Sequence, residues 1–492
     1  MHINHNILSG YLCQICNAIL AILFLPFFFS GLSAEEFGLI GLFTLIQSLF
    51  SIIELGNFQE IIKKVQLLNK KIENGANLFT YIRNVKIILL IFGFFIITIN
   101  LIFVNYINLD VLKYNEINQE TVKISIILIG LIIALRLFEG AFRSILYGLN
   151  SQIWYNYSSV FTSILRYSFS LILIYETKSI EYYFIWQLFI SFILVFLLKY
   201  RINYLLINCT KKKDKNINFL EFFSDSFTNV LYVSLSILLI NLDKIYVAKN
   251  FVLSDFGNYM LATSAASVLF LIVVPITQSM VPAYIKLYAN KKLEILSIKY
   301  NKLDIFIKTI LVSLAVNGCI FSEGILYFWS GNMVLVNSTG SLFSILVLAY
   351  LFNSLIYLPS QIMIIKELII VNLKILSLML IISILILFFT SNFNDINYVA
   401  YSTLFINLLH YMVIVFYKNR NVFMGINKYY QYISLSLSLL LTYIITSFLK
   451  LFGPTIFNNN RIEWLLFVGF STIICLISNI LADNIIYKKL CN

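Results

Sequence analysis

Charged residues are scarce in this sequence of 492 residues: 12% are Asp, Glu, Lys or Arg, whereas 60% are apolar. Soluble domains carry about 25% charged residues. A soluble fold of this length cannot bury so much apolar surface, so lipid must cover most of it. The scarcity of charge therefore excludes a soluble globular protein and predicts an integral membrane protein.

Cysteine is also scarce, with six residues in the chain. Cys13 and Cys16 form a CxxC pair, but it lies inside an apolar run without a nearby zinc partner, and the other four are too scattered for a disulfide framework. Glycine-rich phosphate loops, HExxH motifs and nucleophile elbows are missing as well. We therefore expect no metal site, no cofactor and no enzymatic activity.

Fourteen apolar runs are long enough to cross a bilayer, which takes about twenty residues. They are residues 7–29, 37–56, 84–104, 123–146, 154–175, 182–199, 224–247, 256–281, 304–328, 341–365, 369–390, 396–417, 430–450 and 462–482. The predicted fold class is all-α, with about fourteen transmembrane helices.

The net charge of +12 gathers in short loops between these runs, where it orients the chain rather than binding nucleic acid. With the N-terminus placed in the cytoplasm, most Lys and Arg fall on that side. Its clusters include Lys63/Lys64, Lys211–Lys213, Lys291/Lys292, Lys418/Arg420 and Lys488/Lys489. The contrast persists to the last run, so we predict that both termini are cytoplasmic in a bacterial plasma membrane.

An internal repeat divides the chain. A shift of 219 positions aligns residues 36–59 with 255–278, including Phe37-Gly38 with Phe256-Gly257. Both segments would run inward, so the repeat is parallel, and such halves hold substrate between them. We predict two pseudo-symmetric six-helix bundles at 1–208 and 223–428, a basic cytoplasmic linker at 209–222 and two additional helices at 429–492.

Charged residues inside apolar runs cost about 2.5–3.5 kcal/mol each on insertion scales and mark candidate sites. Arg136, Glu139 and Arg143 share one helical face because they are spaced by three and four residues. They would line a polar cavity in which the arginines bind an anionic head group, since a guanidinium grips phosphate oxygens in pairs. The alternative is an internal salt bridge in which Glu139 neutralises one arginine.

Other intramembrane charges are more isolated. Arg166 lies in mid-run without a neighbouring carboxylate and is a third candidate for a cationic cavity. Asp243 and Lys244 form either a gate or a plain helix-end pair. Glu54 is either a proton or cation site or a partner of an arginine in the run 123–146. Lys308 is expected to anchor its helix by extending to the interface.

Several short motifs resemble the O-antigen and related polysaccharide flippases. They are ILSGY at 7–11, FGL at 37–39, ELG at 54–56, YGLNSQ at 147–152, LDKI at 242–245 and FGNY at 256–259. The resemblance implies the multidrug/oligosaccharidyl-lipid/polysaccharide exporter fold, alternating access without ATP hydrolysis, and a cationic cavity. It spans most of residues 1–300 and is faint afterwards.

The resemblance implies translocation of undecaprenyl-diphosphate-linked oligosaccharide units of the O-antigen or capsule type. Coupling to an ion or proton gradient is compatible with this activity, but no residue in the sequence establishes it. Expected partners are this lipid-linked substrate, membrane lipids, and the polysaccharide polymerase and chain-length proteins of lipopolysaccharide biosynthesis. Two alternatives stay open: a membrane polysaccharide polymerase or ligase, and a cation-coupled multidrug exporter of the same superfamily. Many such exporters use a carboxylate in their first helix, and residues 7–29 contain none.

Overall fold

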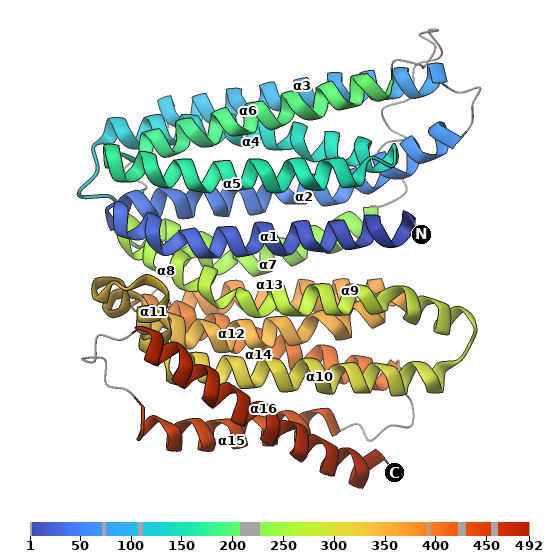
Figure 1. Cartoon of the computed structure of the whole chain (residues 1–492), viewed down its shortest axis with the longest axis vertical. Helices are drawn as coiled ribbons and strands as arrows, with labels where there is room; N and C mark the ends of the chain where they lie inside the picture. The colour runs from blue at the N-terminus through green and yellow to red at the C-terminus, as the bar shows by residue number, and fades with distance from the viewer. Residues whose placement is uncertain are drawn as a thin grey trace. The chain divides into compact units, whose positions relative to one another are not determined.

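Long α-helices make up the architecture (Figure 1). The computed structural model describes residues 2–70, 75–106, 112–206, 227–390, 393, 395–421, 430–453 and 461–491. Within these ranges sixteen helices and no strand occur. A helix satisfies its own backbone hydrogen bonds, which is the condition for crossing the apolar core of a bilayer.

The N-terminal helices are α1 (His2–Gly31), α2 (Ala34–Lys70), α3 (Gly75–Tyr106), α4 (Gln119–Gly148), α5 (Gln152–Thr177), α6 (Ile180–Leu205), α7 (Phe227–Asn250) and α8 (Leu253–Ala266). They are followed by α9 (Val268–Ala289), α10 (Leu293–Ile320), α11 (Ser322–Ser330), α12 (Met333–Ile365), α13 (Ile369–Thr390), α14 (Ile396–Asn421), α15 (Tyr430–Lys450) and α16 (Arg461–Cys491).

Fourteen spans are long and apolar enough to cross a membrane in the described part of the chain, which confirms the predicted number and an all-α, multi-pass membrane protein. The runs 369–390 and 430–450 coincide with α13 and α15. The run 304–328 was predicted as one helix, which is wrong: α10 ends at Ile320, and a separate helix, α11, follows. The break at Phe321 is followed by Ser322, Glu323 and Gly324, three residues that the long apolar run around them outweighs in a hydropathy average.

Two compact units divide the chain: residues 1–241 with 248–257, and residues 242–247 with 258–492. In the first unit α4 packs against α2, α3 and α6, while α1 packs against α5. In the second unit α12 packs against α9, α10 and α14, and α15 and α16 pack together against α10. The predicted linker at 209–222 lies outside the described residues.

Two helix starts agree with the shift of the predicted repeat. A shift of 219 moves Ala34 onto Leu253, and these residues begin α2 and α8. The start of α2 is fixed by a capping box, in which Ser33 and Glu36 each accept a hydrogen bond from the other's backbone N–H, at 3.2 and 2.9 Å. Next to it, the buried carboxylate of Glu35 accepts hydrogen bonds from three successive backbone amides of residues 115–117.

Candidate functional site

The polar stripe on α4 contains an ion pair. Arg136 Nη1 lies 3.3 Å from Glu139 Oε2, and the two side chains are 17% and 12% exposed. The two residues lie one helical turn apart, and the carboxylate of Glu139 neutralises the charge of Arg136 locally. Of the two alternatives drawn from the sequence, the internal salt bridge is therefore present for this arginine.

Arg143 lies on the same face of α4, two turns beyond Arg136, and is half-buried. It interacts electrostatically with Cys13 of α1 and with Tyr147 and Tyr155. The Tyr147 hydroxyl donates to Asn156 Oδ1 at 3.1 Å, and the amide of Asn156 donates to Ser9 on α1 at 3.0 Å. Arg143 thus belongs to a polar region where α1, α4 and α5 meet.

Arg166 on α5 is 6% exposed and lies against α6. Its Nη2 donates to the hydroxyl of Ser191 at 3.4 Å, and its Nε has no hydrogen-bond partner among the described residues. The ion pairs found in the described part of the chain involve other residues. Burying a guanidinium beside a single hydroxyl costs free energy, because the charge loses its hydration and gains no carboxylate as a partner.

Asp243 and Lys244 lie in the second unit and point to different partners, as consecutive helical residues must. The Tyr259 hydroxyl donates to Asp243 Oδ2 at 2.6 Å, and the Thr403 hydroxyl donates to it at 3.3 Å. Asp243 Oδ1 has no hydrogen-bond partner within the described chain, and Lys244 interacts with Tyr350. These contacts join α7 to α8, α12 and α14, and the gating or coupling role stays a prediction.

The Glu54 side chain lies outside the described residues, although the backbone of α2 is described there. Among the residues that were placed, no three His, Cys, Asp or Glu side chains gather in a way that would hold a metal ion.

Two buried lysines were misassigned from the sequence. Lys308 was expected to extend to the interface, but it is 2% exposed and pairs with Asp483 of α16. Lys418 was counted among the loop cations, but it lies inside α14 and is fully buried. Both errors have the same cause. Hydropathy shows that a lysine lies near the end of an apolar run, but it does not show which polar side chains of other helices contact that lysine.

A sequence signal for these partners does exist. Ser471, Cys475, Asn479 and Asp483 follow one another at steps of four residues, which places them on one face of α16. On α15 the hydroxyls at 434, 438, 442 and 446 have the same spacing. All eight side chains are buried, so two regular polar stripes predict a polar seam between helices.

Comparison with solved structures places this arrangement among known folds. The chain is similar to a lipid II flippase, MurJ, in an inward closed conformation: the TM-score is 0.71 with 14% identity, over 99% of each chain. It is also similar to an inward-facing multidrug resistance MATE family transporter of the MOP superfamily, with a TM-score of 0.61 and 12% identity over 84% of this chain and 98% of that one.

A third similar structure is that of a mutant of a Vibrio cholerae MATE transporter, with a TM-score of 0.53 and 13% identity over 87% of this chain and 98% of that one. No family model matches the chain, and no curated protein matches it in sequence. At these identities the likeness concerns the fold alone: the chain has the helical architecture found in the MurJ lipid II flippase and, over a smaller share of its length, in MATE transporters.

Proposed function

We propose that this protein is a flippase that translocates undecaprenyl-diphosphate-linked oligosaccharide units across the bacterial plasma membrane by alternating access. One observation carries the proposal. The similarity to the lipid II flippase extends over 99% of the chain, whereas the MATE transporters cover 84–87% of it. A lipid-linked glycan is thus favoured over a small drug as the substrate.

The chemistry of the substrate fits the intramembrane charges of the first unit. In hydrocarbon, an unpaired sugar hydroxyl costs a few kcal/mol and a bare diphosphate costs far more. Among the described residues Arg166 is buried with only the Ser191 hydroxyl bonded to it, so an approaching phosphate would supply the negative charge that it lacks. Arg143 is the second proposed ligand, and Arg136 is the third, which would have to exchange Glu139 for the substrate.

Glycan transport by the purified protein tests the proposal. The protein is reconstituted in vesicles with a fluorescent undecaprenyl-diphosphate oligosaccharide, and lipid exposed on the outer leaflet is quenched over time. We expect Arg166→Ala to slow the flip by at least about tenfold, because a charge-assisted hydrogen bond contributes about 1.5–3 kcal/mol. Lys199→Ala is the matched control, since Lys199 is an exposed cation on α6.

Unchanged flipping by Arg166→Ala, or equal slowing by Arg166→Ala and Lys199→Ala, would rule out the proposed cationic site. A set of substrates in the same assay then separates an O-antigen or capsule repeat unit from a peptidoglycan precursor. If no lipid-linked glycan moves, the flippase itself is excluded.

A multidrug exporter is the second candidate, because MATE transporters share the fold over most of the chain. Export of a fluorescent cationic drug from the same vesicles, without glycan transport, would favour it. A polymerase or ligase is distinguished in cells: its loss leaves single repeat units at the surface, whereas loss of a flippase leaves none.

A further inference from the structure

A groove opens on the surface of the first unit, between α3 and α6. The helix α4 packs against both of them (Figure 1) and forms the floor of the groove, where Ala134 is 4% exposed. Leu90 and Phe94 of α3 line one wall, Phe192 of α6 lines the other, and all three side chains are largely exposed. The groove therefore has an apolar floor and apolar walls.

Hydrocarbon is the occupant that this lining favours. The volume of the groove is about 640 Å³, which lies in the range of about 300–1,000 Å³ that is usual for small-molecule sites. A bound water needs about two to four polar partners, and the residues that line the groove are apolar. All three helices belong to the spans that are long and apolar enough to cross a membrane, so a lipid chain is the apolar molecule beside the groove.

A lysine lies at one end of the groove. Lys86 precedes Leu90 by one turn of α3 and shares its helical face. Its ammonium group donates to Asn203 Oδ1 of α6 at 3.2 Å and lies 5.9 Å from the centroid of the Phe142 ring of α4. The contacts of Lys86 thus involve the same three helices that form the groove.

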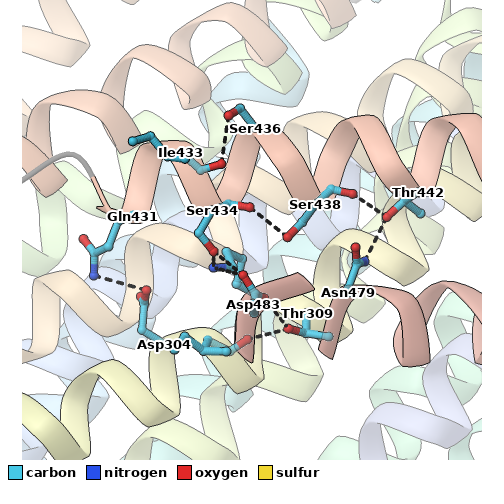
Figure 2. Close-up of polar contacts among 12 residues, drawn as sticks. Asp304, Thr309, Gln431, Ile433, Ser434, Ser436, Ser438, Thr442, Asn479 and Asp483 are labelled. Carbon is cyan, nitrogen blue, oxygen red and sulfur yellow. Dashed lines mark hydrogen bonds and ion pairs between the residues drawn. The ribbon is translucent and has the colours of Figure 1, made fainter. Parts of the chain in front are cut away.

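The charge of Lys86 is not balanced by a carboxylate within the part of the chain that the structure describes. In the second unit Lys308 pairs with Asp483, whose polar surroundings Figure 2 shows. Lys86, by contrast, has a neutral amide as its hydrogen-bond partner, and Lys199 of α6 adds a like charge nearby. This end of the groove is therefore positively charged, and basic pockets between transmembrane helices bind anionic lipid head groups.

Hydrogen-bond donors converge at this point. An ammonium group carries three N–H donors, of which Lys86 uses one for Asn203. The amide nitrogen of Asn203 carries two further donors, because its oxygen is the atom that accepts from Lys86. The lysine is half-buried and the asparagine is exposed, so a ligand can reach both. A phosphate group at this point would accept hydrogen bonds from the two side chains together.

The height of this contact matches the head-group level of a bilayer. Tyr200 and Tyr204 flank Asn203 on α6 and are exposed, and tyrosine is enriched at this level. From Lys86 to Ile97, at the far end of the groove, α3 rises by about 16 Å. Half of the apolar core of a bilayer is about 15 Å thick. A lipid chain that starts beside Lys86 would therefore follow the groove and end near the middle of the membrane.

We propose that Lys86 and Asn203 bind the phosphate of an anionic phospholipid, and that one acyl chain of this lipid occupies the groove between α3 and α6. With the predicted orientation, the lipid belongs to the cytoplasmic leaflet. The inference goes beyond the proposed function and stands independently of it, because it concerns a lipid of the surrounding membrane and not the transported substrate.

Photo-crosslinking of lipids tests this proposal. The purified full-length protein is reconstituted in phosphatidylcholine vesicles that contain a small fraction of phosphatidylglycerol, or of phosphatidylcholine, with a diazirine in the middle of an acyl chain. After illumination, mass spectrometry of peptides locates the attached lipid. We expect phosphatidylglycerol to label the peptides around Phe94 and Phe192 about fivefold more than phosphatidylcholine, because a cation near the membrane surface contributes about 1 kcal/mol to the binding of anionic lipid.

Lysine variants test the head-group contact. Lys86→Gln should reduce the labelling by phosphatidylglycerol to that by phosphatidylcholine, whereas Lys86→Arg should keep most of it, because a guanidinium also binds phosphate. Lys374→Gln is the matched control, since Lys374 is an exposed lysine near the start of α13, outside the groove, and this variant should be labelled like the wild type. Equal labelling by the two lipids, or a preference that survives Lys86→Gln, overturns the proposal.

A variant with a filled groove tests the position of the acyl chain. Ala134→Phe places a ring on the floor and should lower the labelling around Phe94 and Phe192 by both lipids. Ile381→Phe, at an exposed position of α13, is its control and should leave this labelling unchanged. Thermal unfolding shows whether Ala134→Phe is folded, and the lysine variants decide the outcome if it is not. Unchanged labelling of a folded Ala134→Phe protein, or protein dimers cross-linked through this face without attached lipid, contradicts the proposed lipid site.

Discussion

Gly38 and Gly257 touch each other where α2 crosses α8, and the predicted internal repeat aligns these two positions. A Cβ atom on Gly257 would lie 3.0 Å from the backbone nitrogen of Gly38 and 2.7 Å from the carbonyl oxygen of Ala34. A Cβ atom on Gly38 would likewise collide with the Leu253 carbonyl oxygen. The two backbones approach this closely because neither glycine carries a side chain, as at other small-residue crossings in membranes.

The first prediction follows from this contact. Gly257→Ala should destabilise the protein by about 1–3 kcal/mol, the usual cost of forcing an extra methyl into a packed site. Gly469→Ala on α16 is the matched control, because a Cβ atom there would have no heavy atom within 4 Å. It should be neutral or stabilising by up to about 1 kcal/mol. Thermal unfolding in detergent measures both, and equal shifts for the two variants would contradict the close crossing.

Glu35 provides the second prediction. Its carboxylate accepts from the backbone amides of residues 115, 116 and 117, at 2.7, 2.8 and 3.1 Å. Glu35→Gln places an NH₂ group against one of these donors and should destabilise by about 1–3 kcal/mol. Glu116→Gln, whose side chain is exposed in the same segment, should change unfolding by less than about 0.5 kcal/mol. Equal losses in the two variants would show that the buried carboxylate does not hold this segment.

The sequence predicts the helices well because a bilayer imposes one simple requirement on them. About twenty apolar residues are needed to cross, and fourteen runs meet that requirement. The repeat stays a prediction, although the two glycines that it aligns, Gly38 and Gly257, lie at a contact that tolerates no side chain. Local sequence is sufficient wherever the constraint is local.

The candidate sites were less predictable, because the role of a charged residue depends on its contacts, and many of these come from residues distant in sequence. The partner of Lys308 is Asp483, 175 residues away, and hydropathy gives no sign of it. Arg136, by contrast, has its partner Glu139 one turn away, and that alternative was visible in the spacing. The burial of Arg166 against Ser191 depends on how α5 meets α6, which no local pattern reveals.

The third prediction concerns orientation. Loop cations favour the cytoplasm, so both termini should lie there. A green fluorescent reporter fused after Asn492 should fluoresce, whereas one fused after Phe452, which follows α15, should be exported and stay dark. The physical reason is that the positive charges near the end of α16 are retained inside. Fluorescence from the Phe452 fusion, or none from the full-length fusion, would reverse the predicted orientation or change the number of crossings.

The last prediction concerns the neutral part of the seam between α10 and α16. Asn317 is fully buried, accepts from the Ser471 hydroxyl at 2.5 Å, and donates to the Ser313 carbonyl of its own helix at 2.7 Å. A double-mutant cycle of Asn317→Leu and Ser471→Ala should give a coupling energy of about 0.6–1.7 kcal/mol, the range for interhelical hydrogen bonds in membranes. Unfolding of the four proteins in mixed micelles measures it.

Ser436→Ala is the control for this cycle, because Ser436 is exposed on α15 and, in the described part of the chain, bonds only to Ile433 of its own helix. Its coupling with Asn317 should be zero within about 0.3–0.5 kcal/mol. The Asn317–Ser471 coupling should also be the same at about pH 5 and about pH 8, because neither side chain titrates in this range. A coupling that falls with the pH would contradict a hydrogen bond between two neutral side chains at this point of the seam.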